Sequence, residues 1–216
     1  MRKTKTQNSI LVLATLGVYL GLVLIGAAPQ VLAQQEHNVE INKRPLIDFA
    51  ESLNDRIQSK QIDLTGTFSV TVQGPLSPNG RLDISRSKVV QSSGDAKLVD
   101  VGKSGIAAIS DSGWLVYLSS LGATEVAITV AQDDKNFSGK IEFEVKTPER
   151  AKTIASGLKM ALSVHKTESE NSPDEKLLID NTSVVADRAT VTVALVMTAS
   201  SYRDMLLSRL NKTKGE

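Results

Sequence analysis

The feature that most constrains this chain is a run of 19 residues without a charged side chain, at residues 10–28. Arg2, Lys3 and Lys5 precede the run, and no acidic residue occurs before Glu36. As a helix the run is about 28 Å long at about 1.5 Å per residue, close to the hydrocarbon core of roughly 30 Å. A terminal, uniformly apolar run behind three cations is typical of a segment that enters a membrane.

Two interpretations of this leader stay open. Val31 and Ala33 place a β-branched and a small residue at the −3 and −1 positions of a signal-peptidase site, which predicts a signal peptide of residues 1–33. Alternatively, residues 10–28 remain as an uncleaved anchor in the inner membrane. In both cases the positively charged flank stays inside, so residues 34–216 lie on the far side of the membrane. We therefore expect an exported domain.

The composition excludes several kinds of function. The chain has no Cys, which rules out a disulfide framework, a Cys-ligated zinc site, a thiol nucleophile and a lipid-modified Cys. Its 25 basic and 24 acidic residues give a net charge of +1, which argues against a nucleic-acid-binding protein. Aromatic residues make up only 4 % of the chain, so the core must be aliphatic.

A hairpin is predicted in the first half of the chain. Residues 64–73 alternate between apolar and polar side chains, the pattern of a half-buried strand. Residues 74–80 form a turn in which Asn-Gly provides positive φ angles, and residues 81–90 return as a second strand. The apolar positions of the first strand are Phe68, Val70 and Val72.

Helices flank this hairpin. Pro45 opens a helical pattern that extends to Ile57, after a polar linker at residues 34–44. The sequence Ser-Ser-Gly-Asp ends the second strand, and Ser93 or Asp95 caps a helix that runs towards residue 110. A short helix is expected at residues 114–121.

The second half repeats the pattern. Strands are predicted at residues 124–132 and 140–146, and Thr147 begins an amphipathic helix before a polar loop at residues 166–175. Short strands near residues 177–179 and 183–185, a clearer strand at residues 189–197, and a helix capped by Thr198, with Tyr202, Leu206 and Leu210 inward, complete the chain.

The order of hairpin and then helix occurs near residues 66–110, at residues 124–165 and at about residues 177–210. We therefore predict an α+β fold of repeated ββα units with antiparallel sheets behind the N-terminal helix. Residues 45–121 form the first part of the folded region, and residues 122–216 form a second αβ unit.

No residue pattern indicates catalysis. His37 and His165 are the only histidines, too few for a zinc site, and no Gly-x-Ser-x-Gly or phosphate-binding glycine loop occurs. Asp133 and Asp134 lie in a predicted hairpin turn, where paired acids usually cap the backbone. We therefore predict no enzymatic activity, no cofactor and no metal. The single tryptophan, Trp114, has two interpretations, a core residue or an aromatic anchor for a partner.

Residues 66–110, about a fifth of the chain, resemble the C-terminal domain of TonB-type energy transducers. The shared pattern is a strand, a Pro-Asn-Gly turn followed by Arg-Leu, a strand ending Lys-Val-Val-Gln, then Ser-Ser-Gly-Asp and a helix with Leu98 and Ala107. The resemblance implies a periplasmic domain behind an N-terminal membrane helix. It also implies that sheet edges pair with short segments of partner proteins.

Together these features predict a periplasmic, non-enzymatic interaction protein whose exposed strand adds to a strand of an envelope partner. The candidate contact residues are Phe68, Val70, Val72, Arg81, Leu82, Ile84 and Trp114. Two alternatives stay open. The hairpin strands are interior to a sheet, or the stacked units enclose an apolar pocket and the protein binds a ligand or a lipid.

Overall fold

The computed structural model describes residues 41–83, 85–167 and 172–212, with side chains described as far as residue 208. The expected leader, residues 1–33, and most of the expected linker lie outside the described residues. Within the described ranges, no helix combines the length and the apolar character that crossing a membrane requires.

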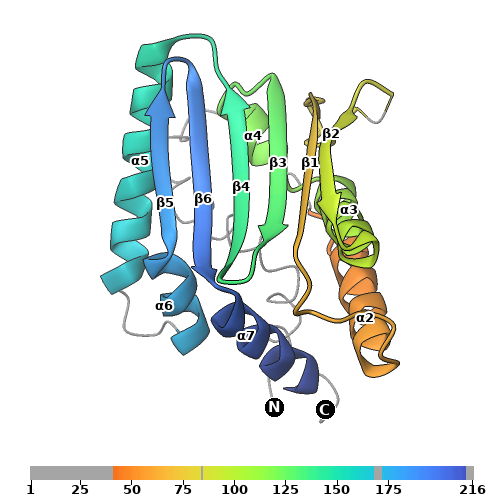
Figure 1. The fold of residues 1–216 in the computed structure, drawn as a ribbon. Helices are drawn as coiled ribbons and strands as arrows, with labels where there is room; N and C mark the ends of the chain where they lie inside the picture. The colour runs from red at the N-terminus through yellow and green to blue at the C-terminus, as the bar shows by residue number, and fades with distance from the viewer. Residues whose placement is uncertain (1–40, 84, 168–171, 213–216) are drawn as a thin grey trace, which may run out of the picture.

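The centre of the fold is a six-stranded antiparallel sheet with the strand order β2-β1-β3-β4-β6-β5 (Figure 1). The first half of the sheet consists of β1 (Phe68–Pro75), β2 (Lys88–Gly94) and β3 (Glu125–Gln132). The second half consists of β4 (Asn136–Glu144), β5 (Thr182–Asp187) and β6 (Thr190–Thr198). Every pair of neighbouring strands is antiparallel.

Six described helices complete the fold. They are α2 (Arg44–Gln58), α3 (Ala96–Asp111), α4 (Val116–Ser120), α5 (Pro148–Thr167), α6 (Pro173–Asp180) and α7 (Ala199–Lys212). Along the chain, two strands are followed by one or two helices, three times in succession. The prediction of an α+β fold with hairpins, helices and an antiparallel sheet is therefore confirmed.

The alternation along each strand separates a core face from a polar face. In one row across the sheet, Ile128 pairs with Ile141, which pairs with Val193, and all three are buried against the helices. In the next row, on the opposite face, the hydroxyls of Thr71 and Thr129 lie 3.0 Å apart. The period of two residues thus places the apolar side chains under α3, α4 and α5, which lie behind the sheet in Figure 1.

Side-chain caps begin several helices at the predicted residues. The Asp95 carboxylate accepts from the backbone N–H groups of Lys97 at 2.8 Å and Leu98 at 3.0 Å, so Asp95 is the N-cap of α3. The Thr198 hydroxyl accepts from the backbone N–H of Ser201 at 3.1 Å at the start of α7. Both caps satisfy N–H groups that have no partner within the helix.

Two of the predicted strands are wrong. The second strand begins at Lys88 and not at residue 81, and it continues through the Ser-Ser-Gly sequence to Gly94. Residues 177–179 belong to α6 and not to a strand. Ser172 and Glu175 form a reciprocal capping box there, which starts a helix across the apolar residues that follow.

The two expected parts of the folded region share one sheet and one core. The sequence boundary between residues 121 and 122 precedes β3, which pairs along its whole length with β1 of the first part. One cluster of buried side chains extends from Leu46 in α2 to Met205 in α7. The three ββα units therefore pack as neighbours in a single layer of strands.

Candidate functional site

The predicted contact residues on β1 lie inside the sheet. Phe68 and Val70 are buried on the core face, and Val72 is half-buried beside them. β1 pairs with β2 on one side and with β3 on the other. Both of its edges are therefore occupied, and a partner strand has no free edge on β1 to pair with.

The other predicted residues are divided between the surface and the core. Arg81 is exposed, whereas Leu82 is buried, and the Leu82 backbone N–H donates to the Ser110 hydroxyl at 3.0 Å. Ile84 lies outside the described residues. Trp114 is only 2 % exposed and lies beside Tyr117, with their ring centroids 6.3 Å apart. Trp114 therefore packs in the core and is not accessible to a partner.

Two strands form the outer edges of the described sheet, β2 at one end and β5 at the other (Figure 1). All seven residues of β2 are exposed, including Val89 and Val90 at 49 % and 53 %. On β5, Val184 is buried at 4 % because α5 packs across that strand. β2 is thus the outer strand that the rest of the described fold covers least.

A β-bulge interrupts the pairing of β2 with β1. Val89 lies opposite Val72 and Gln91 lies opposite Thr71, so Val90 is an extra residue without a partner on β1. A bulge bends an edge strand and increases its local twist, which limits uncontrolled pairing with other strands. The bulge divides the outer edge of β2 into two short segments with different directions.

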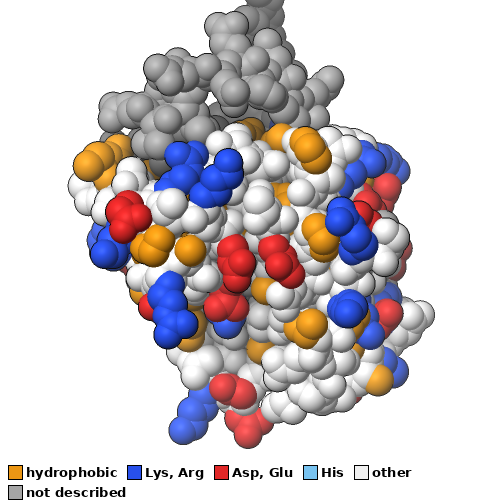
Figure 2. Space-filling view, turned by 90° about the horizontal axis from the view of Figure 1, so that it is seen from above, with side chains coloured by type: hydrophobic (Ala, Val, Ile, Leu, Met, Phe, Trp, Pro, Cys, Tyr) orange, Lys and Arg blue, Asp and Glu red, His pale blue; other side chains and the backbone are white. Residues whose placement is uncertain are grey.

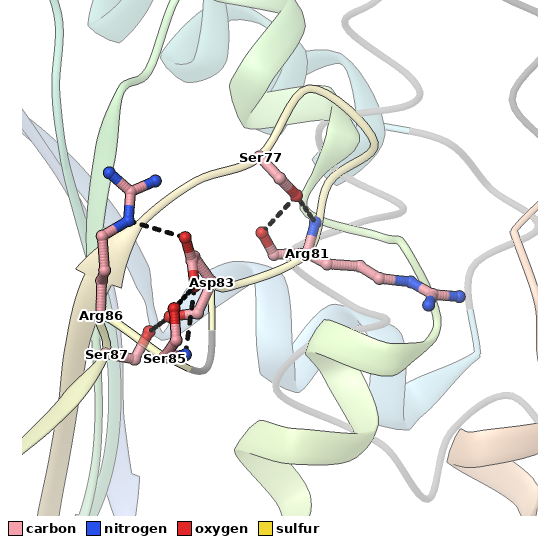
Figure 3. A network of polar contacts seen from close by, with 6 residues as sticks. All are labelled: Ser77, Arg81, Asp83, Ser85, Arg86 and Ser87. Carbon is pink, nitrogen blue, oxygen red and sulfur yellow. Dashed lines mark hydrogen bonds and ion pairs between the residues drawn. The ribbon is translucent and has the colours of Figure 1, made fainter.

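The connection into β2 is a compact network around Asp83 (Figure 3). The Asp83 carboxylate accepts from the Ser85 hydroxyl at 2.6 Å and from Arg86 Nε at 2.7 Å. The Asp83 carbonyl accepts from the Ser87 backbone N–H and from the Ser87 hydroxyl, both at 2.8 Å. These bonds account for the late start of β2, because they hold the residues before Lys88 in a turn.

The same network changes the acidity of Asp83. The hydrogen bond from the Ser85 hydroxyl, and next the bond from Arg86, lower the pKa of the Asp83 carboxyl below its ordinary value, because both stabilise the ionised form. Asp83 is therefore ionised throughout the neutral range, and the turn keeps its acceptor.

The tip of the hairpin is a second tight turn, shown in Figure 3. The Ser77 hydroxyl donates to the Arg81 carbonyl at 2.6 Å and accepts from the Arg81 backbone N–H at 3.1 Å. Gly80 has a φ of 73°, and a Cβ there would lie 2.0 Å from the backbone nitrogen of Val116. Glycine is therefore required at this position both by its backbone angle and by the helix packed against it.

The C-terminal end of β2 is also fixed by contacts with the backbone. Gly94 has a φ of 89°, and a Cβ on it would lie 2.2 Å from the Thr67 carbonyl oxygen. The next residue, Asp95, donates its backbone N–H to the same carbonyl at 2.8 Å and also caps α3. The outer strand is therefore fixed between two anchored turns, which preorganises its free edge.

The described part of the surface seen from above carries side chains of both charges. Figure 2 shows basic, acidic and hydrophobic side chains interspersed over this face. The described residues include no group of three or more His, Asp or Glu side chains that would hold a metal ion. The Asp133 carboxylate caps its own turn by accepting from the backbone N–H groups of Lys135 at 2.8 Å and Asn136 at 2.7 Å.

The sequence prediction missed β2 as the outer strand, and it assigned Asp83 and Ser85 to a strand. An Asp followed two residues later by a Ser is a recognisable local signal, because the carboxylate can accept from that residue's backbone N–H and hydroxyl. The sequence contains no comparable signal for the order of the strands.

No family model matches the sequence, and the searches of curated proteins and of solved structures also gave no match. The fold and the β2 edge are therefore interpreted from their own geometry.

Proposed function

We propose that this protein is an exported, non-enzymatic interaction module that binds an extended segment of an envelope protein along the outer edge of β2. The observation that carries the proposal is the exposure of all seven residues of β2 between two anchored turns. The resemblance of residues 66–110 to TonB C-terminal domains supports the same mode of binding, because sheet edges pair with partner segments in that family.

Binding of this kind uses main-chain hydrogen bonds for affinity and side chains for selectivity. An outer strand presents backbone N–H and C=O groups to solvent, so a partner strand can bond to them without displacing any part of the fold. Val89 and Val90 supply apolar contact area beside that edge, and Lys88 supplies a positive charge at one end. We therefore infer a partner segment with apolar residues and an acidic residue near the end that pairs with Lys88.

The bulge at Val90 makes the proposal more specific. A long flat edge accepts almost any strand, whereas a bent edge accepts only a short segment in one register. The partner segment is therefore short, and its contacts lie on one side of the bulge or span it with a matching bend.

Site-specific photo-crosslinking tests the binding edge. A photoreactive amino acid is placed at Val90 on β2 and, in matched controls of similar exposure, at Val185 on β5 and at Val164 on α5. The proteins are produced from the full gene in cells that naturally make the protein. We expect adducts from Val90 alone, with the crosslinked residues clustered in one extended segment of the partner.

A substitution then tests whether the crosslinked segment binds at β2 or only lies near it. Val90→Asp places a negative charge beside the edge, and we expect it to reduce the affinity of the identified peptide segment at least tenfold, whereas Val185→Asp leaves it unchanged. Adducts from Val185 or Val164 without adducts from Val90 would reject β2 as the binding edge.

The proposed compartment has its own test. The intact mass of the protein, measured in the membrane and periplasmic fractions of a Gram-negative host, distinguishes loss of residues 1–33 from retention of the full chain. Recovery of the full-length chain in the cytosol, in neither fraction, would contradict export.

A further inference from the structure

A cavity of about 80 Å³ lies between three helices and the core face of the sheet. α2, α3 and α7 form its walls, and β1, β3 and β4 form its floor. It is partly open to solvent. The site is separate from the outer edge of β2, which contributes no lining residue.

The lining of the cavity is almost entirely apolar. Phe68, Ile106 and Leu206 are among its buried lining side chains, and Val101 and Val130 are half-buried. Such a lining holds water poorly, because an ordered water molecule needs two or more polar partners. An apolar group is therefore the chemically suitable occupant.

The one buried amide in the lining already has partners for its N–H groups. Gln132 Nε2 donates to the Leu64 carbonyl at 2.7 Å and to the Gly66 carbonyl at 2.8 Å. These bonds connect the amide to the chain between α2 and β1, so its two donors do not serve a ligand. Recognition in this cavity therefore depends on shape and apolar contact.

A glycine on α3 lets an aromatic ring approach the helix closely. A Cβ at Gly105 would lie 3.2 Å from the Cζ atom of Phe49, so the ring packs directly on the helix backbone. The Phe137 ring on β4 and the Tyr202 ring on α7 also line the cavity, and they stack with centroids 3.5 Å apart and their planes 2° from parallel. Aromatic rings from α2, β4 and α7 thus contribute flat apolar surfaces to the lining.

The volume limits what can enter. A cavity of about 150 Å³ takes up benzene, and this one has about half that volume. A ring or a bulky branched group is therefore too large to enter whole, whereas the end of an unbranched chain enters lengthwise. At about 30 Å³ for a group the size of a water molecule, the space holds roughly three carbons.

We propose that this cavity binds the terminal carbons of an unbranched alkyl chain, such as that of a fatty acyl group. The rest of the chain and its polar head extend through the open side to the surface. The inference is independent of strand pairing at β2, because the cavity and the edge share no residue.

The test is a titration with 1-alkanols from ethanol to octanol, using protein produced from the full gene and labelled with ¹³C at the isoleucine methyl groups. Ile106 and Ile109 line the cavity, and Ile179 in α6 is a buried methyl reference away from it. We expect saturable changes in chemical shift for the methyl groups of Ile106 and Ile109 only. The affinity should rise about fourfold for each added carbon until roughly three are buried, and then level off.

Two variants of one residue change the volume in opposite directions. Val101→Phe fills the cavity and should abolish the saturable shifts. Val101→Ala enlarges the cavity, so the affinity should level off at a longer 1-alkanol. Val164→Phe and Val164→Ala, on the exposed face of α5, are the matched controls and should behave as the unchanged protein does.

The unchanged protein also provides a decisive comparison of isomers. The affinity for 1-butanol, measured from the shifts of the cavity methyl groups, should be at least tenfold higher than the affinity for tert-butanol, whose branched group is too large. Equal binding of the two isomers, or an affinity that rises along the whole series without a plateau, would overturn the proposal. Decanoate and phospholipid vesicles, tested separately, distinguish a free chain from a membrane chain as the source, and no shift with either would also overturn it.

Discussion

Replacing Gln132 by Met should lower the stability of the protein far more than a surface substitution of the same type. Gln132 is 7 % exposed, and its amide donates to two backbone carbonyls between α2 and β1. Methionine has a similar length and volume, so the change removes both hydrogen bonds without creating a large void. The half-buried residues Leu64 and Gly66 then each lose a partner for the backbone carbonyl.

The size of the effect follows from those two bonds. A neutral hydrogen bond contributes about 1 kcal/mol net, and a buried group left without a partner costs about 1–3 kcal/mol. We therefore expect Gln132→Met to lower the free energy of unfolding by about 2–4 kcal/mol. Urea unfolding measures this as a lower midpoint with an unchanged slope. Faster amide hydrogen exchange in residues 64–67 should accompany it.

The matched control is Gln73→Met on the same sheet. Gln73 is exposed, and its amide donates to Glu125 Oε1 at 3.0 Å. Because solvent replaces that bond, the change should alter stability by no more than about 0.5 kcal/mol. The reasoning would be refuted if Gln132→Met cost no more than Gln73→Met.

Three further changes test the anchored turns around β2. Gly80→Ala should destabilise the protein by more than about 1 kcal/mol, and by more than Gly113→Ala, as thermal unfolding can show. Both glycines have positive φ, but a Cβ at Gly80 would lie 2.0 Å from the Val116 backbone nitrogen, whereas a Cβ at Gly113 would lie 3.5 Å from the Asn79 carbonyl oxygen. The pKa of Asp83 is lowered in the folded state, so its contribution to stability is present above the ordinary value of 3.8 and is lost as the pH falls through the lower folded value. An NMR titration of Asp83 should give a midpoint below 3.8, and Ser85→Ala should raise that midpoint. Asp95→Ala should cost about 1 kcal/mol in urea unfolding through loss of the α3 cap, and an unchanged midpoint would exclude that role.

Local patterns in the sequence predicted most of the elements. The alternation in residues 124–132 and 140–146 identified the β3–β4 hairpin, because each strand has one face in the core and the other face more exposed. β4 begins earlier than predicted, at Asn136. The helix caps at Asp95 and Thr198 were also identifiable, because a short polar side chain before an apolar stripe satisfies the free N–H groups of a helix.

The local errors have a common physical cause. Leu177, Leu178 and Ile179 are consecutive apolar residues, which a helix and a strand both accommodate, so the preceding residues decide between them. The capping box at Ser172 favours the helix. Similarly, Asp83 accepts hydrogen bonds from the Ser85 hydroxyl and from the Ser87 backbone N–H. Because this turn occupies the residues after Asp83, they do not pair with β1.

The candidate site depended on information that the pattern of one strand does not contain. Alternation shows that β1 is a strand, but it does not show whether β1 has a neighbour on each side. That depends on where β3 pairs, and β3 comes later in the chain: its residue Gln132 lies opposite Phe68 of β1. The sequence therefore identified the hairpin, and the tertiary structure identified which of its two strands is open.

The order of the three hairpins across the sheet is the same as their order along the chain. Each new hairpin needs only the one before it as a template, so the sheet can grow in one direction while the chain is still being synthesised. No strand has to insert between two that are already paired. The β2 edge is complete once the first unit has folded, and the later units extend the sheet away from it.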